Sequence, residues 1–226
     1  MYIGHFAIGM AIKAAAPKVR ALPILVGAGF LDIIDGVLIV AGIDRVTPNL
    51  QAGPYLFFDL TFIDWDHSLL MALVLSLAWA ALFLKQRTAA LVAGLACFSH
   101  FLADLPMHNA DLAVYPYAAK HLGLGLWGRL QTGAWVLEGL FAAIVLAWAW
   151  TRFRARGVAV GWPLLVLGVL FVNLSPWLSP MKVAAGLPEP QAHLLHGVLV
   201  TLGFLGPGAL LAWLVDRAER RSVAAT

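Results

Sequence analysis

The chain has 226 residues, of which 62% are hydrophobic and 12% are charged, and its formal net charge is +3. These proportions exclude an ordinary soluble domain and predict an integral membrane protein with a single helical domain over residues 1–226. The basic residues are dispersed among short loops, so we expect no nucleic-acid partner. The single cysteine, Cys97, excludes an intrachain disulfide and a cysteine-rich metal site.

The apolar pattern predicts an all-α membrane fold with about six transmembrane helices. Residues 1–20 lack the basic segment and the cleavage site of a signal peptide. Their apolar part is short for a span and ends at Pro17, which predicts a re-entrant or interfacial helix. The apolar segments that follow approach the roughly 20 residues that a bilayer requires. They cover residues 22–43, 68–84, 88–105, 134–150, 162–178 and 191–215.

Lysine and arginine residues gather in alternate loops, which the positive-inside rule places in the cytoplasm together with both termini. The remaining loops are richer in carboxylates and are expected to face outward. The basic residues that set this orientation are Lys13, Lys18, Arg20, Lys85, Arg87, Arg152, Arg154, Arg156, Arg217, Arg220 and Arg221.

His100 and Asp104 lie four residues apart in the third segment and therefore share one face of a helix. An ionisable side chain at membrane depth is costly unless it is paired or bound to something, and this spacing suits a metal ion. Pro106 predicts that the helix ends at Leu105, with His108 just beyond it. The orientation places this pair in the outer half of the membrane.

Other ionisable residues are expected at the same depth. His67 begins the second segment at the outer face, and Asp32 and Asp35 lie about one helical turn apart in the first. His5 reaches the depth of Asp32 if the chain turns near Pro17. Ser68 offers a hydroxyl partner or an alternative nucleophile, although a simple hydrogen bond is the plainer interpretation.

For several further polar residues the sequence leaves the role open. Asp66 is as well placed to cap the second span as to bind a metal. The other candidates are His108, Glu138, His193 and His196, and the histidines among them are typical of the membrane interface. Aromatic residues near the ends of segments, including Trp127, predict an interfacial belt without chemistry.

Four short motifs occur in a fixed order along the first two-thirds of the chain. They are Gly4-His5, Leu31-Asp32-Ile33-Ile34-Asp35, Asp66-His67-Ser68-Leu69-Leu70 and Ser99-His100-Phe101-Leu102-Ala103-Asp104. Together they resemble the motifs of the bacterial YdjM-like (DUF457-type) membrane proteins, a family expected to be metal-dependent hydrolases. The chain has Leu31 where that family commonly has proline, and it lacks an additional histidine upstream of the His-Ser pair. The resemblance implies a multi-pass protein of the bacterial inner membrane.

These observations lead us to expect a zinc-type hydrolase that acts on a lipid or lipid-linked ester, amide or phosphoester at the outer face. His67, His100 and Asp104 are the expected core ligands, with His5 and Asp32 completing one metal or bridging toward a second. Asp35 is the expected general base.

Two other classes remain open. A permease or ion-coupled transporter would use the same intramembrane residues. If it were an inverted repeat, however, the end of the sixth segment would carry counterparts of His100 and Asp104, and that stretch has no ionisable residue. A structural or accessory subunit would bind nothing at these side chains.

Overall fold

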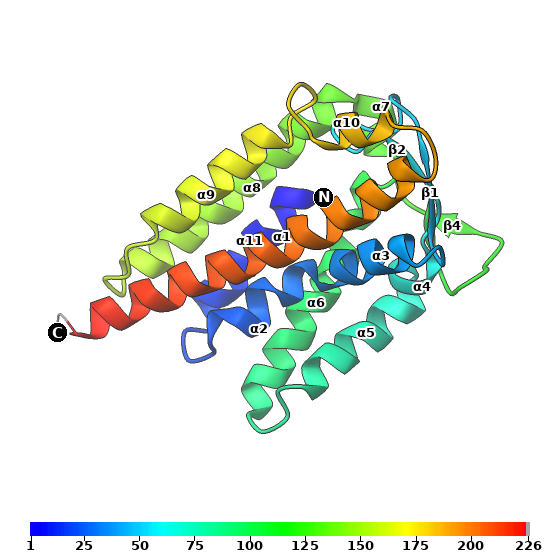
Figure 1. Cartoon of the computed structure of the whole chain (residues 1–226). Coiled ribbons are helices and arrows are strands. Elements are labelled where there is room, and N and C mark those ends of the chain that lie inside the picture. The colour runs from blue at the N-terminus through cyan, green and yellow to red at the C-terminus, as the bar shows by residue number, and fades with distance from the viewer. Residues whose placement is uncertain (225–226) are drawn as a thin grey trace.

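The computed structural model describes residues 1–224, which form a bundle of helices with two small sheets at one end (Figure 1). The helices up to α6 are α1 (Tyr2–Ala15), α2 (Ala21–Leu25), the 3₁₀ helix η1 (Gly27–Gly29), α3 (Phe30–Val40), α4 (Asp64–His67), α5 (Leu69–Ala81) and α6 (Arg87–Met107). The later helices are α7 (Leu126–Leu130), α8 (Thr132–Arg154), α9 (Gly161–Asn173), α10 (Met181–Ala185) and α11 (Gln191–Ala224).

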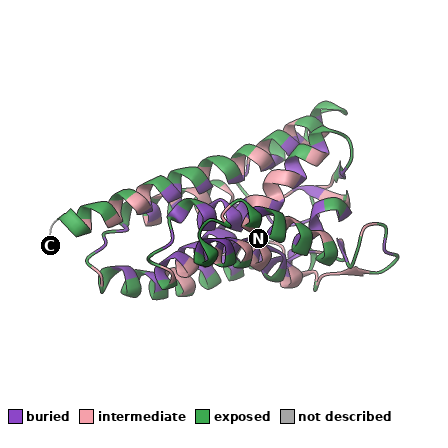
Figure 2. Cartoon of the chain, turned by 90° about the horizontal axis from the view of Figure 1, so that it is seen from below, coloured by how far each residue is buried: buried purple, intermediate pink, exposed green. Residues whose placement is uncertain are grey.

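Four helical segments are long and apolar enough to cross a membrane, namely Ala21–Val40, Arg87–Met107, Thr132–Arg154 and Gln191–Ala224. The other two expected spans, α5 and α9, have 13 residues each. At 1.5 Å per residue they are about 20 Å long, whereas the hydrocarbon core is about 30 Å thick. Exposed residues, green in Figure 2, line the outer faces of the helices. Many of them are large and apolar, such as Ile144, which is 72% exposed. The chain is therefore mostly helical, as expected, and four of its helical segments have the length and composition of membrane spans.

The first long segment is not the continuous helix that the sequence predicted. The chain passes from α2 through η1 into α3, and the glycines of η1 permit close contacts with other helices. A Cβ atom on Gly27 would lie 2.6 Å from Trp79 Nε1, and one on Gly29 would lie 2.7 Å from a ring atom of Phe204. The break therefore occurs where α5 and α11 approach the backbone too closely for a side chain.

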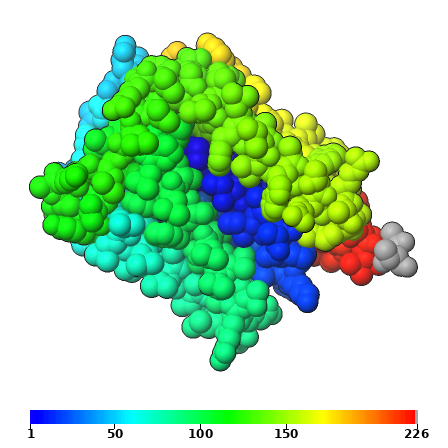
Figure 3. Space-filling model, turned by 180° about the vertical axis from the view of Figure 1, so that it is seen from behind, coloured from blue at the N-terminus to red at the C-terminus, as the bar shows by residue number. Residues whose placement is uncertain are grey.

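The N-terminal helix α1 is buried and lies between α6 and α8, where its blue atoms are visible from behind (Figure 3). The chain turns after Ala15 and returns in α2, as the proline at position 17 predicted. Lys13 fixes the end of α1, because its Nζ atom lies 2.7 Å from Glu219 Oε2. Arg156 adds a bond from Nη1 to the Ala14 carbonyl at 2.7 Å. This arrangement carries His5 into the interior.

Helix α11 packs closely against α3 at a pair of glycines. A Cβ atom on Gly36 would lie 2.4 Å from the Gly197 carbonyl oxygen and 2.3 Å from Thr201 Oγ1. Small residues let helix backbones approach in this way. The crossing fixes the rotation of α3 and hence the direction of Asp32 and Asp35.

The end of the bundle that carries the sheets contains β1 (Arg45–Pro48) paired antiparallel with β2 (Phe58–Phe62), and β3 (Leu112–Ala113) paired with β4 (His121–Leu122). We expected no strands, because these segments lie in loops between apolar runs. Helices α7 and α10 gather at the same end (Figure 1). These elements close the bundle over the polar residues described below.

Helix α6 runs through Pro106 to Met107, two residues beyond the predicted end at Leu105. Proline removes one N–H from the helix, but the N–H of His108, two residues further on, still donates to the Asp104 carbonyl at 2.9 Å. Met107 is buried and anchors the last turn. His108 therefore keeps its place one turn beyond Asp104.

Candidate metal centre

Four helices bring histidine and aspartate side chains into one buried cluster. His5 comes from α1, Asp32 from α3, His67 from α4, and His100 with Asp104 from α6. The histidine side chains and Asp104 are at most 2% exposed, and Asp32 is 17% exposed. All the ligands expected from the sequence therefore lie in this region, although they come from separate parts of the chain.

Hydrogen bonds fix which nitrogen of His100 and His67 faces the cluster. His100 Nδ1 lies 2.8 Å from the Ala28 carbonyl oxygen of η1. A carbonyl only accepts, so Nδ1 carries the proton and Nε2 of neutral His100 presents a lone pair. His67 Nδ1 contacts the Asp66 carboxyl group in the same manner. Both rings thus direct Nε2 inward, and in a neutral ring this atom offers the lone pair that a metal ion would bind.

The inward atoms of these side chains lie 3.0–3.8 Å from one another where a distance is known. The two Nε2 atoms of His67 and His100 lie 3.3 Å apart, and Asp104 Oδ2 lies 3.8 Å and 3.0 Å from them respectively. The Asp32 oxygens lie 3.5 Å from His67 Nε2 and 3.3 Å from His100 Nε2. Zinc bonds of about 2.0–2.2 Å would separate tetrahedral ligands by roughly 3.3–3.6 Å. His67, His100 and Asp104 thus lie close to this spacing, and Asp32 forms a candidate metal-ligand group with the same two histidines.

The other oxygen of Asp104 faces a second pair of histidines. Asp104 Oδ1 lies 3.1 Å from His5 Nε2 and 3.6 Å from His108 Nε2, and the Met1 amino group also contacts it. His5 stacks on His100 with ring centroids 3.6 Å apart. His108 Nδ1 is held by Asp111 Oδ1 at 2.9 Å. The hairpin thus brings His5 to Asp104 and His100, rather than into a metal-ligand group with Asp32.

The buried carboxyl groups of Asp35 and Asp66 lie close to His67. Ligand atoms of Asp35, Asp66 and His67 all lie within 4.8 Å of one another, and Asp35 Oδ1 has no hydrogen-bond partner. Burial raises the pKa of Asp66 well above its usual range, and the adjacent Asp44 carboxyl raises it further. Burial also raises the pKa of Asp44. Asp66 Oδ2 contacts His67 Nδ1, so Asp66 orients this histidine.

The remaining candidates lie outside the four-ligand group. Ser68 Oγ accepts the Met71 amide at 3.3 Å and caps α5. Glu138 accepts from the Gly4 amide at 3.1 Å and from the Tyr55 hydroxyl at 2.6 Å. Burial, and then the Glu138 carboxylate, raise the pKa of Tyr55 well above its usual value, so this hydroxyl keeps its proton.

The two histidines of α11 also lie apart from the ligand group. His193 Nε2 bonds to the Ile39 carbonyl at 2.8 Å. His196 is buried, and its ring centroid lies 4.3 Å from that of Phe58. Neither belongs to a metal-ligand group among the residues that the structure describes.

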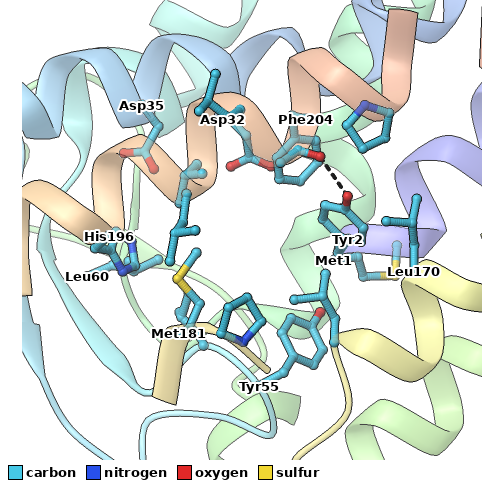
Figure 4. A pocket seen from close by; sticks show the side chains of 18 of the residues that line it. Met1, Tyr2, Asp32, Asp35, Tyr55, Leu60, Leu170, Met181, His196 and Phe204 are labelled. Carbon is cyan, nitrogen blue, oxygen red and sulfur yellow. Dashed lines mark hydrogen bonds between the residues drawn. The ribbon is translucent and has the colours of Figure 1, made fainter. Parts of the chain in front are cut away.

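A cavity of about 350 Å³ adjoins the cluster (Figure 4). Its polar wall includes Asp32, Asp35, His67 and His108, and most of its other walls are apolar. Trp127, which we expected in the interfacial belt, is instead 4% exposed and forms part of the wall. The volume falls within the range of small-molecule sites. The candidate metal centre is therefore open to a bound ligand on the side of Asp32.

Sequence reasoning missed several residues that shape the centre. Asp44 and Asp111 lie in the loops whose carboxylates indicated only the orientation of the chain. A backbone carbonyl such as that of Ala28 cannot be recognised as a histidine partner from residue types. The spacing of Asp111, three residues after His108, was the one available indication of their pairing.

Comparison of the chain with models of known families, with curated proteins and with solved structures found no match in any of the three. The functional assignment therefore depends on the geometry of the His/Asp cluster and its cavity.

Proposed function

We propose that the protein is a membrane-embedded hydrolase that uses a zinc ion held by Asp32, His67, His100 and Asp104. The observation that supports it most is the convergence of the Nε2 atoms of His67 and His100 with carboxylate oxygens of Asp32 and Asp104, at 3.0–3.8 Å from one or both histidines. Nitrogen and carboxylate ligands in this geometry favour zinc over magnesium or calcium. The motif order shared with YdjM-like proteins points to the same class.

The ion would supply Lewis-acid chemistry, because zinc polarises a carbonyl or phosphoryl oxygen and makes water acidic near neutral pH. His67, His100 and Asp104 are the buried anchors, and Asp66 keeps the His67 ring in its binding orientation. Asp32 is the ligand most exposed to the cavity, so it borders the position where water and the scissile group meet.

Asp35 is the proposed general base. It lies on the cavity wall with Asp32 (Figure 4), and its unpartnered Oδ1 atom leaves it free to take a proton from water. A positioned carboxylate of this kind contributes through proton transfer in the transition state. Ser68 is assigned a structural role, because its hydroxyl oxygen already caps α5.

The proposed location is the inner membrane of a bacterium, with six spans, both termini in the cytoplasm and the metal centre toward the outer face. A cysteine at the exposed position Ala155 tests this, since the native Cys97 is buried. A membrane-impermeant maleimide should modify the Ala155→Cys protein only after the membrane is permeabilised. Modification in intact cells would place the centre on the cytoplasmic side.

The central test measures the metal content of the purified protein by mass spectrometry of the elements. The parent should carry zinc, and His100→Ala or Asp104→Ala should lose it while retaining the helical circular dichroism spectrum. His193→Ala is the matched control, because this histidine bonds to a backbone carbonyl away from the cluster. Full zinc occupancy in His100→Ala and Asp104→Ala would refute the ligand set.

An ion-coupled transporter is the alternative that the same side chains permit. It would move zinc or protons across reconstituted vesicles and release no hydrolysed product. Ion flux that depends on Asp104, with no turnover of any lipid ester or phosphoester, would replace the hydrolase proposal.

A further inference from the structure

We infer that the cavity beside the metal centre holds a hydrocarbon chain of a membrane lipid, which enters sideways between α9 and α11. The inference rests on the proposed function in one respect: hydrolysis of the bound lipid requires the zinc site, to which the lipid would present its ester or phosphoester. The binding of the chain itself depends on the cavity alone.

The most exposed residues of the cavity lining belong to α9 and α11. Leu202 of α11 is 60% exposed, Asn173 at the end of α9 is exposed, and Leu199 and Leu170 are half-buried. The lining residues at the opposite end, such as Tyr55, are buried. The cavity therefore opens between α9 and α11 and ends inside the bundle.

This opening faces the depth at which lipid chains lie. Gly203 is roughly 18 Å along α11 from Gln191, at 1.5 Å per residue, within a hydrocarbon core about 30 Å thick. The stretch of α11 from Gly197 to Val215 contains no charged residue. A water-soluble ligand would have to cross this apolar surface, whereas a lipid chain already occupies it.

Pro207 of α11 affects the backbone at the opening of the cavity, which we call its mouth. Pro207 has no N–H and leaves the Gly203 carbonyl without its helical partner. The Tyr2 hydroxyl donates to that carbonyl at 2.6 Å, which the dashed line in Figure 4 marks. A Cβ atom added to Gly203 would meet no atom within 4 Å. At this edge of the opening, Gly203 therefore leaves free space because it has no side chain, and its carbonyl group still has a hydrogen-bond partner in Tyr2.

The polarity of the cavity matches that of a lipid from end to end. Leu170, Leu199 and Val200 supply apolar walls near α9 and α11, and Asp32 and His67 lie at the metal centre. A hydrocarbon chain gains by burying its surface against the apolar walls. The polar linkage at its head can then approach the zinc site without placing the chain against carboxylates.

Photolabelling tests this inference without requiring turnover. The protein is reconstituted in vesicles of phosphatidylethanolamine and phosphatidylglycerol that include phosphatidylglycerol with a diazirine in one acyl chain. After irradiation, peptide mass spectrometry should find label on Tyr55 and Met181, which line the buried part of the cavity. Ile144 on the outer face serves as the positive control for contact with bulk lipid.

Gly203→Trp should abolish label at Tyr55 and Met181 by filling the mouth. Gly206→Trp is the matched control, because Gly206 lies on the same helix, also has free space at Cβ and does not line the cavity. Both variants should keep label on Ile144. Gly203→Leu provides a smaller side chain if the tryptophan variant does not fold.

Two results would overturn the inference: no label on Tyr55 and Met181 in the parent, or equal label there in the Gly203→Trp and Gly206→Trp proteins. Zinc content measured on the same samples separates the two proposals. Label in the cavity without zinc would leave the chain-binding site in place and refute the hydrolase. Zinc without label in the cavity would refute the chain-binding site and leave the hydrolase proposal in place.

Discussion

Asp66 does not belong to the proposed ligand group, yet its contact with His67 predicts a measurable effect on the proposed zinc affinity. Its carboxyl group holds His67 Nδ1 and so keeps the Nε2 atom directed at Asp104 and Asp32. Asp66→Ala removes this bond and lets the ring rotate. Loss of such a partner typically costs 10–100-fold in metal affinity, which corresponds to about 1.4–2.8 kcal/mol. The worth of a hydrogen bond to a charged group, about 1.5–3 kcal/mol, gives the same range.

The assay is competition for zinc between the purified protein and a fluorescent chelator, with unfolding followed separately to confirm the fold. Asp66→Asn keeps a carbonyl oxygen that can accept from Nδ1 and should recover part of the lost affinity. Asp111→Ala is the matched control, because Asp111 holds His108, which faces the other oxygen of Asp104. A zinc Kd in Asp66→Ala equal to that of the parent would refute this account of His67.

Three further substitutions test the proposed catalytic role of Asp35, the structural role of Ser68 and the packing at Gly36. Asp35→Asn should keep zinc and lower turnover of a lipid substrate by roughly 10²–10⁴-fold, and unchanged turnover would remove Asp35 as the base. Ser68→Ala should lose the α5 cap and about 1 kcal/mol of stability in denaturant unfolding; a loss of turnover at full zinc content would instead restore Ser68 as a nucleophile. Gly36→Ala places a methyl group 2.3 Å from Thr201 Oγ1, so overpacking should cost about 1–3 kcal/mol. Gly168→Ala on α9, where the added Cβ meets nothing within 4 Å, should be tolerated, and equal stability of these two glycine variants would contradict the close α3–α11 crossing.

Composition and periodicity were sufficient to predict the helical membrane class. Apolar runs near the length of a bilayer can be recognised one segment at a time, because each helix satisfies its own backbone hydrogen bonds. Four helical segments have the length and hydropathy of such spans. The crossing of α5 and α9, the orientation in the membrane, the zinc ion and the hydrolase activity stay predictions.

The sequence also predicted which ionisable residues gather, since orientation and spacing place His67, His100 and Asp104 at one depth. It could not predict which atoms face each other. That depends on the rotation of each helix about its axis, which the contacts at Gly36 and Gly27 set through helices distant in sequence. The sequence also failed to predict the strands, because β1 pairs with β2 and β3 with β4 through backbone contacts that residue patterns within each segment do not show.

The sequence by itself determined the membrane class, the order of the polar motifs and the face shared by His100 and Asp104, because these follow from hydropathy and a helical period. Only the tertiary structure decided that His5 meets Asp104, that the Ala28 carbonyl selects the His100 tautomer and that Asp66 orients His67. Each of these is a contact of about 3 Å or less made by a side chain whose ring or carboxyl group can turn. Such contacts depend on how whole helices pack, which local sequence patterns do not specify.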